Sequence, residues 1–212
     1  MRRFGSAGLY LVTSASVSRG RPTEKIVESA LEGGVRLVQL REKDLSSREL
    51  TGLARRVKRL TDRYGALLLI NDRLDVALAV DADGVHLGRD DLPVADARRI
   101  APEMIIGASS HSEEEAAAAE MQGASYVNIG PLFPTATKKW TDEFLGLDGL
   151  RRISGRLKGP FTVMGGIKSG HIPDLVAAGA RTIAVVTAVT AAEDPERAAR
   201  DLLKLILGLK TV

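Results

Sequence analysis

The chain has 212 residues, of which 44% are hydrophobic, so it can bury one sizeable core. It carries 30 Lys and Arg against 27 Asp and Glu, interspersed along the chain, and only 4% aromatic residues, which argues against nucleic-acid binding. The absence of cysteine excludes disulfides, thiolate metal sites and cysteine nucleophiles.

The lengths of the apolar runs bear on the cellular location of the protein. The run that follows Arg2 and Arg3 is too short for a signal-peptide core, and no stretch approaches the roughly 20 apolar residues of a membrane span. We therefore expect a cytoplasmic protein with no membrane partner. Its mild positive charge favours small anionic substrates, and the sequence leaves open whether it forms a homo-oligomer.

Short apolar runs alternate with longer amphipathic segments. The runs predict strands over residues 9–13, 35–40, 66–71, 84–87, 105–109, 126–129, 161–164 and 182–186. Between them, helix signals predict helices that start at Pro22, at Ser46 or Ser47, and at Ser112. Ser112 and Glu115 have the spacing of a capping box.

The alternation is typical of parallel βαβ units and favours an α/β fold, a closed (β/α)₈ TIM barrel. The alternative is an open, doubly wound sheet. A dinucleotide-binding sheet of that kind should show Gly-x-Gly-x-x-Gly after its first strand, which residues 13–20 lack. Since no linker or low-complexity tract divides the chain, we expect residues 1–212 to form a single barrel domain.

The second predicted strand ends in polar residues at alternate positions. Gln39, Arg41 and Lys43 would leave one face of an extended chain, so two cations point the same way. This pattern indicates an anion site. The alternative is that both cations are solvated and paired with Glu42 and Asp44.

Two acids follow neighbouring predicted strands. Asp72 and Asp91 could approach one ion from two sides, and two carboxylates without histidine or thiolate partners suit Mg²⁺. The alternative is that Asp72 caps a helix that begins near Arg73, and that Asp90 or Asp91 caps one that begins near Pro93.

Further polar groups follow the later strands. Gly165 and Gly166 come before a predicted helix, so their N–H groups could cradle a phosphate, with the hydroxyl of Thr187 nearby. A Gly-Gly pair is also a common tight turn. The segment 130–139, which contains Lys138, predicts a binding loop or lid, or an ordinary surface loop.

Other chemistries find little support in the sequence. No Ser-His-Asp order is persuasive, and His-Glu-x-x-His is absent. With 3 histidines in the chain, we expect His86 to be a hydrogen-bonded core residue rather than a base. Lys43 could be a Schiff-base nucleophile, but Arg41 and the nearby acids favour phosphate binding.

Several motifs together resemble one known family over nearly the whole chain. They are Gln39-Leu-Arg-Glu-Lys43, Ile70-Asn-Asp72, Asp83-Gly-Val-His-Leu-Gly88 with Asp90-Asp91, Gly130-Pro-Leu-Phe-Pro-Thr-Ala-Thr-Lys138 and Gly165-Gly-Ile167. The family is thiamine phosphate synthase. The resemblance implies a (β/α)₈ barrel that joins hydroxymethylpyrimidine diphosphate to thiazole phosphate and releases pyrophosphate, through a carbocation-like pyrimidine.

The resemblance also implies roles for single residues. Asp72 and Asp91 would hold Mg²⁺, and the catalytic groups would be Arg41, Lys43, Ser109 and Lys138. The pyrimidine diphosphate would contact Gln39, Arg41, Lys43, Asn71, Ser109 and Lys138. The thiazole phosphate would contact Thr135, Thr137, Gly166, Val186 and Thr187.

The chain departs from the family pattern at a few positions and leaves two rivals. Arg89, Ser110, Met164 and Thr187 stand where relatives commonly have other residues, and Arg89 is expected to pair with Asp90. A related barrel isomerises the thiazole phosphate and, as the resemblance suggests, uses a histidine where this chain has Pro131. A barrel that only binds a phosphorylated metabolite would not need two metal acids.

Overall fold

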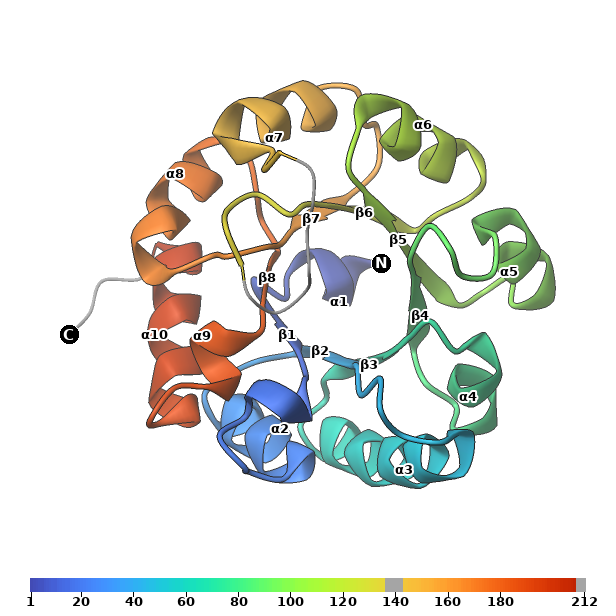
Figure 1. The fold of residues 1–212 in the computed structure, drawn as a ribbon, viewed down its shortest axis with the longest axis vertical. Helices are drawn as coiled ribbons and strands as arrows, with labels where there is room; N and C mark the ends of the chain where they lie inside the picture. The colour runs from blue at the N-terminus through green and yellow to red at the C-terminus, as the bar shows by residue number, and fades with distance from the viewer. Residues whose placement is uncertain (136–142, 209–212) are drawn as a thin grey trace.

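The computed structural model describes residues 1–135 and 143–208. Its strands surround a central axis and its outer helices lie around them (Figure 1). All neighbouring strands are parallel, in the order β1-β2-β3-β4-β5-β6-β7-β8, and β1 pairs with β8 to close the ring. The predicted (β/α)₈ barrel is confirmed, and the open sheet is excluded.

The strands lie close to their predicted positions. They are β1 Leu9–Val12, β2 Leu37–Leu40, β3 Leu67–Asn71, β4 Gly84–Leu87, β5 Ile105–Ser110, β6 Tyr126–Ile129, β7 Phe161–Val163 and β8 Ile183–Val185. The largest difference is at β2, which begins two residues later than expected. The N–H of Val35 donates to Ala30, so Val35 still belongs to the end of the preceding helix.

Helices alternate with the strands. The α-helices are α1 Arg2–Gly5, α2 Thr23–Glu32, α3 Ser47–Arg63, α4 Leu74–Ala79, α5 Val94–Ile100, α6 Glu113–Met121, α7 Gly146–Ser154, α8 Ile172–Ala177, α9 Thr187–Thr190 and α10 Pro195–Leu207. Two 3₁₀ turns, η1 Ala15–Val17 and η2 Ser169–His171, complete the described elements. Within residues 1–135 and 143–208, no helix has the length and apolarity needed to span a membrane.

The predicted serine caps are present, with one difference. Ser46 caps α3 and forms a complete capping box with Glu49. Ser112 caps α6 through its side chain, which accepts from the N–H of Glu115. The Glu115 carboxylate does not return to Ser112 but accepts from the N–H of His111, so only half of the predicted box forms.

The apolar residues form two layers, inside and outside the sheet. In β1, Leu9 and Leu11 join the outer layer against the helices, whereas Tyr10 and Val12 point into the barrel. The inner layer is a small cluster that consists of Phe4, Ala7, Tyr10, Val12, Leu37, Leu67, Leu69, Tyr126 and Ala184. Because Phe4 packs on the Tyr126 ring with centroids 4.4 Å apart, α1 closes the end of the barrel from which β1 starts.

A glycine in β5 makes room for the largest inner side chain. A Cβ atom at Gly107 would lie 2.1 Å from Cζ of Tyr126, which no real side chain tolerates. The ring of Tyr126 therefore occupies the space that a side chain at Gly107 would fill.

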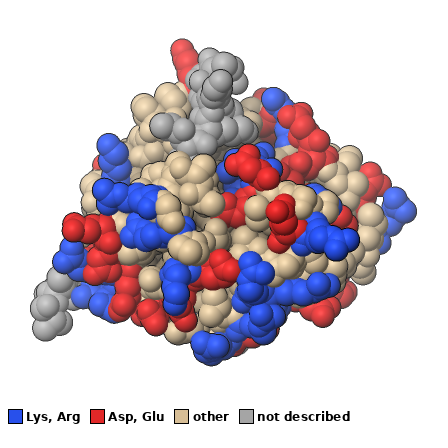
Figure 2. Space-filling model, turned by 60° about the horizontal axis from the view of Figure 1, so that its bottom comes forward, with Lys and Arg blue, Asp and Glu red and all other residues tan. Residues whose placement is uncertain are grey.

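Charged side chains on the outer surface are mixed in sign. On the face shown in Figure 2, Lys and Arg lie interspersed with Asp and Glu over much of the surface, and several Lys and Arg side chains adjoin one another in the lower part of the view.

Candidate active site

Polar residues that follow β2, β3, β4 and β5 gather in one pocket at the carboxyl ends of the strands. We call it the charged pocket, and its lining includes Gln39, Arg41, Lys43, Asn71, Asp72, His86, Arg89, Asp90, Asp91, Ser109 and His111. In (β/α)₈ barrels this end of the sheet is where the strand-to-helix loops build active sites. The structure thus brings together seven residues with predicted roles. Gln39, Arg41, Lys43, Asn71 and Ser109 were expected to contact the pyrimidine diphosphate, and Asp72 and Asp91 were expected to hold the metal.

The two cations lie just beyond β2 rather than within it. The strand ends at Leu40, yet Gln39, Arg41 and Lys43 still line the same pocket. Glu42, between the cations, is buried and accepts from the N–H of Ala15 at 2.7 Å and from Oγ1 of Thr23 at 2.8 Å. Glu42 therefore fastens the β2 end to the β1–α2 loop, and the alternative in which it pairs with its neighbouring cations is wrong.

Asp72 occupies a special backbone position. Its φ of 63° lies in the left-handed region, which Asp tolerates better than most residues, and its N–H donates to the carbonyl of His86 at 2.8 Å. The helix that follows has Arg73 at its N-cap and no side-chain cap bond. The capping interpretation of Asp72 is therefore wrong, and its carboxylate lines the charged pocket.

Asp91 likewise does not cap a helix. The N-cap of α5 is Pro93, again without a side-chain bond. The Oδ2 atom of Asp91 accepts from the N–H of Gly88 at 2.7 Å. This bond turns the carboxylate back toward the β4 end and into the charged pocket.

The two acids influence each other. The pKa of Asp72 is raised to about 6, first by burial and then by the neighbouring Asp91 carboxylate, whereas Lys43 and Arg41 lower it. Two carboxylates that disfavour each other's charge are suited to share a hard divalent cation, which would relieve the repulsion. No group of three or more His, Cys, Asp and Glu is placed to hold a metal within the described residues, so further ligands would come from water or phosphate oxygens.

A second pocket adjoins the charged pocket. We call it the glycine pocket, and its lining includes Thr135, Gly165, Gly166, Val186 and Thr187 together with Val12, Asn128, Pro131 and Ile167. Four of the five predicted contacts of the thiazole phosphate therefore share one cavity. The fifth, Thr137, and the predicted catalytic Lys138 lie outside the described residues.

The glycine pair allows a close backbone contact. Gly165 and Gly166 have φ values of 101° and 63°, and a Cβ at Gly166 would lie 2.3 Å from the carbonyl oxygen of Pro134. The N–H of Leu132 donates to Met164 and that of Phe133 donates to Gly165. The loop after β6 is thus fastened to the end of β7, and it forms one wall of the glycine pocket.

The two pockets share residues. Arg41, Ser109, His111 and Met164 line both, so a ligand in one would lie next to a ligand in the other. This juxtaposition is what a reaction between two bound molecules requires.

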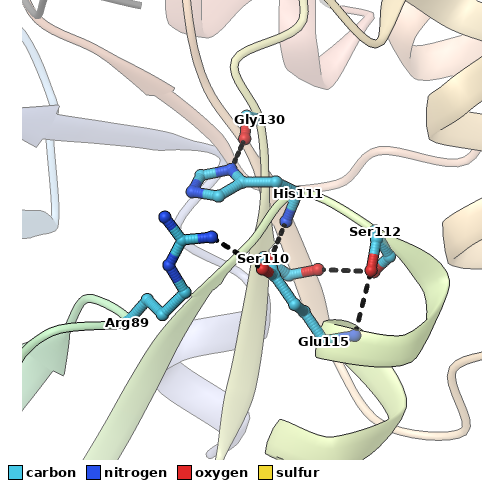
Figure 3. Close-up of polar contacts among 6 residues, drawn as sticks. All are labelled: Arg89, Ser110, His111, Ser112, Glu115 and Gly130. Carbon is cyan, nitrogen blue, oxygen red and sulfur yellow. Dashed lines mark hydrogen bonds and ion pairs between the residues drawn. The ribbon is translucent and has the colours of Figure 1, made fainter. Parts of the chain in front are cut away.

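His111, which the sequence did not single out for a role, lines both pockets. Figure 3 shows its ring directed toward Gly130. Its Nδ1 atom hydrogen-bonds the carbonyl of Gly130, and since a carbonyl only accepts, Nδ1 carries the proton. Its N–H donates to Glu115 at 2.7 Å, and Glu115 also pairs with Arg89 at 3.4 Å. The expected pairing of Arg89 with Asp90 is therefore wrong, because Glu115 on α6 reaches the guanidinium instead.

His86 is a buried, hydrogen-bonded residue, as predicted. Its Nδ1 atom lies 2.8 Å from the hydroxyl of Tyr126 and its Nε2 atom lies 3.0 Å from Oγ of Ser109. Burial lowers the pKa of His86 to about 4, against the smaller raising effect of Asp91. The ring is therefore neutral at pH 7.

Comparison with known proteins places the chain in a family. The family model described as Thiamine monophosphate synthase matches residues 9–189. The chain is 48% identical over 198 residues to the thiamine-phosphate synthase of Chloroflexus aurantiacus, covering 93% of this chain and 92% of that protein. It is 46% identical over 198 residues to the thiamine-phosphate synthase of Pyrococcus horikoshii, covering 93% and 94%.

Solved structures agree with the sequence comparison. A thiamine phosphate pyrophosphorylase from Pyrococcus furiosus has a TM-score of 0.90 and 40% identity, with 99% of each chain covered. A 3-hexulose-6-phosphate synthase from Salmonella typhimurium, with a TM-score of 0.72 and 17% identity, shares the fold alone. The family match spans most of the chain and the relatives match it nearly end to end; the chain belongs to the thiamine monophosphate synthase family.

Proposed function

We propose that this chain is a Mg²⁺-dependent transferase that couples 4-amino-2-methyl-5-hydroxymethylpyrimidine diphosphate with 4-methyl-5-(2-phosphoethyl)thiazole. The products are thiamine phosphate and pyrophosphate. The observation that carries the proposal is the pair of adjoining pockets, one lined by acids and cations and one by glycines and hydroxyls, which share Arg41 and Ser109. Family membership supports the same reaction.

The reaction breaks one bond and forms another. The carbon–oxygen bond between the pyrimidine methylene and the diphosphate breaks, and its electron pair leaves with pyrophosphate. The methylene carbon, now cation-like, accepts the lone pair of the thiazole nitrogen, which forms the new carbon–nitrogen bond and a thiazolium. No net proton transfer is required, which is consistent with a site whose buried histidine, His86, is neutral.

The charged pocket supplies what this bond cleavage needs. Negative charge grows on the leaving pyrophosphate, and Arg41 and Lys43 line the pocket in which it would lie. We assign Lys138 the same role from the family resemblance. Gln39, Asn71 and Ser109 would hold the pyrimidine diphosphate by hydrogen bonds.

Asp72 and Asp91 fit a magnesium ion. They are two carboxylates in one pocket, and the raised pKa of Asp72 reflects burial and then the nearby Asp91. When bound, Mg²⁺ would neutralise charge on the diphosphate oxygens. Lys43, which pairs with Asp72 at 3.6 Å, would help to orient the same diphosphate.

The glycine pocket would hold the second substrate. Thr135 and Thr187 offer hydroxyls and Gly166 and Val186 offer backbone atoms on its lining, and Thr137 completes the set by resemblance. A phosphate bound among them would place the thiazole toward the shared residues Arg41 and Ser109.

A product assay tests the proposal. Purified protein with both substrates and Mg²⁺ should form thiamine phosphate and pyrophosphate, and a chelator should abolish both. No product from folded protein would reject the synthase. A third arm supplies thiazole phosphate alone, because His111 reaches Gly130 beside the place where an isomerase would carry its histidine. Turnover in that arm would favour the isomerase.

A further inference from the structure

A chain of hydrogen bonds crosses the inside of the barrel beneath the charged pocket. Nε2 of Gln39 donates to the hydroxyl of Tyr10 at 2.5 Å, and that hydroxyl lies 3.0 Å from the hydroxyl of Tyr126. Tyr126 is 2.8 Å from Nδ1 of His86, whose Nε2 is 3.0 Å from Oγ of Ser109. Five strands, β2, β1, β6, β4 and β5, each contribute one member.

One direction gives the buried hydroxyl of each tyrosine an acceptor. The amide nitrogen of Gln39 only donates, so Tyr10 accepts there, and its single proton has an acceptor among these residues when it goes to Tyr126. Tyr126 then gives its proton to Nδ1 of His86, so the neutral ring carries its proton on Nε2 and donates to Ser109. The hydroxyl of Ser109 accepts from His86, and its own proton is left to point to another acceptor.

Burial keeps this order in place. Tyr10 and Tyr126 are each 1% exposed and His86 is 5% exposed. Burial raises the pKa of both phenols and lowers that of His86, so all three stay neutral around pH 7. Gly107 leaves the room that the Tyr126 ring needs, and Phe4 packs on that ring.

Both ends of the chain reach the candidate site. Gln39 and Ser109 line the charged pocket, and Ser109 also lines the glycine pocket. The middle members, Tyr10 and Tyr126, line neither pocket. They can act on a ligand only through the residues at the two ends.

We propose that Tyr126 and His86 are positioning residues that hold Ser109 as a hydrogen-bond donor toward an acceptor atom of the bound pyrimidine diphosphate. The inference rests on the proposed function, because it takes that substrate as the occupant of the charged pocket. It assigns the reaction two residues that act through Ser109.

A double-mutant cycle tests the coupling. Tyr126→Phe removes one hydroxyl and keeps the ring, so His86 loses the donor that fixes its tautomer. We expect kcat/KM for the pyrimidine diphosphate to fall about 10-fold, the worth of one hydrogen bond. In the Ser109→Ala background the same change should cost less than about twofold, because the effect passes through Ser109. Equal losses in both backgrounds would overturn the inference.

His86 provides a rescue. His86→Gln keeps one acceptor and one donor, whereas His86→Leu keeps neither. We expect the Gln variant to retain more kcat/KM than the Leu variant, and the advantage to vanish with Ser109→Ala. Equal activity of the Gln and Leu variants in the presence of Ser109 would count against the positioning role.

Nitrogen NMR of the His86 ring shows which ring nitrogen carries the proton, and therefore the direction of the hydrogen bonds, without an activity assay. At neutral pH, His86 should carry its proton on Nε2 in the parent protein, and Tyr126→Phe should increase the fraction with the proton on Nδ1. A parent protein with the proton on Nδ1 would contradict the proposed direction.

Controls separate folding and function from positioning. Thr61→Val removes a fully buried hydroxyl on α3, away from the barrel interior, and should change kcat/KM equally little in both backgrounds. If the parent protein forms no product, the proposed function fails and the inference fails with it. Product formation with additive losses overturns the inference alone.

Discussion

The Nζ atom of Lys43 lies 3.6 Å from Oδ2 of Asp72, so the cation expected to face pyrophosphate contacts the acid expected to hold the metal. Burial and Asp91 raise the pKa of Asp72, while Lys43 and Arg41 lower it. The carboxylate is thus held between opposing influences in a partly buried place. A change at either residue should therefore alter metal binding and catalysis together.

Asp72→Asn should separate metal binding from folding. The amide keeps the shape but removes one of two negative charges, so we expect a loss of about 100-fold in kcat/KM and a higher Mg²⁺ requirement. Titrating the rate with Mg²⁺ measures both. Asp96→Asn, which removes an exposed acid of α5, is the matched control. A normal rate at limiting Mg²⁺ would remove Asp72 from the proposed metal site.

Arg41→Ala should slow bond cleavage more than it weakens binding. If the guanidinium faces the leaving pyrophosphate, its loss costs roughly 2 to 4 kcal/mol of transition-state stabilisation, or about 30- to 1,000-fold in kcat. Single-turnover kinetics at saturating substrate provide the measurement. Arg48→Ala, an exposed arginine on α3, serves for comparison. An unchanged kcat would mean that Arg41 is merely solvated.

Thr187 should matter for one substrate only. Thr187→Val keeps the shape and removes the hydroxyl on the lining of the glycine pocket, so KM for the thiazole phosphate should rise about 10-fold or more. KM for the pyrimidine diphosphate should hardly change. Thr187→Ser keeps the hydroxyl and should restore the parent values. A rise in both constants would argue against separate pockets.

His86 should make the fold sensitive to mild acid. Its pKa falls from 6.5 to about 4 on burial, so the unfolded chain binds the proton more readily than the folded one. The contribution of His86 to the free energy of unfolding is fully present above pH 6.5. It is lost as the pH falls toward 4, by about 3 kcal/mol. Urea denaturation of the parent protein and of the His86→Gln variant, measured over this pH range with a chelator present, isolates the contribution of His86. Parallel profiles for the two proteins would contradict it.

Gly107→Ala and Gly52→Ala should have opposite effects on stability. The new Cβ at Gly107 meets the Tyr126 ring, so we expect destabilisation of roughly 1 to 3 kcal/mol. At Gly52, within α3, a Cβ meets only Arg56 at 3.7 Å, and a gain of up to about 1 kcal/mol is expected. The denaturant midpoints of both variants measure these changes in stability. A tolerated Gly107→Ala would mean that the inner layer repacks.

Local patterns were sufficient to predict the barrel and most of the site's location. Short apolar runs predicted both ends of β4 and β6 correctly, because short buried strands have a local signal. The family motifs, read with the barrel rule that loops after strands carry function, indicated which polar residues would meet. Their roles, the single-domain division and the cytoplasmic location stay predictions.

Contacts between residues that lie far apart in the chain could not be predicted from the sequence. Tyr10 and Tyr126 are 116 positions apart and meet only because the strands close in one register. Their hydroxyls carry no local pattern, and Gly107 resembles any other strand glycine until the Tyr126 ring is in place. Likewise, the pairing of Arg89 with Glu115 rather than Asp90 depends on where α6 lies relative to the loop after β4.

The contact between the β6 loop and the end of β7 is made by main-chain atoms of Leu132, Phe133, Met164 and Gly165. A wall built from backbone takes its outline from the path of the main chain. An added methyl group at Gly165 or Gly166 would therefore push the wall itself out of place. In related proteins, variation in substrate size should thus follow the residues that project from this wall, and the two glycines should stay fixed.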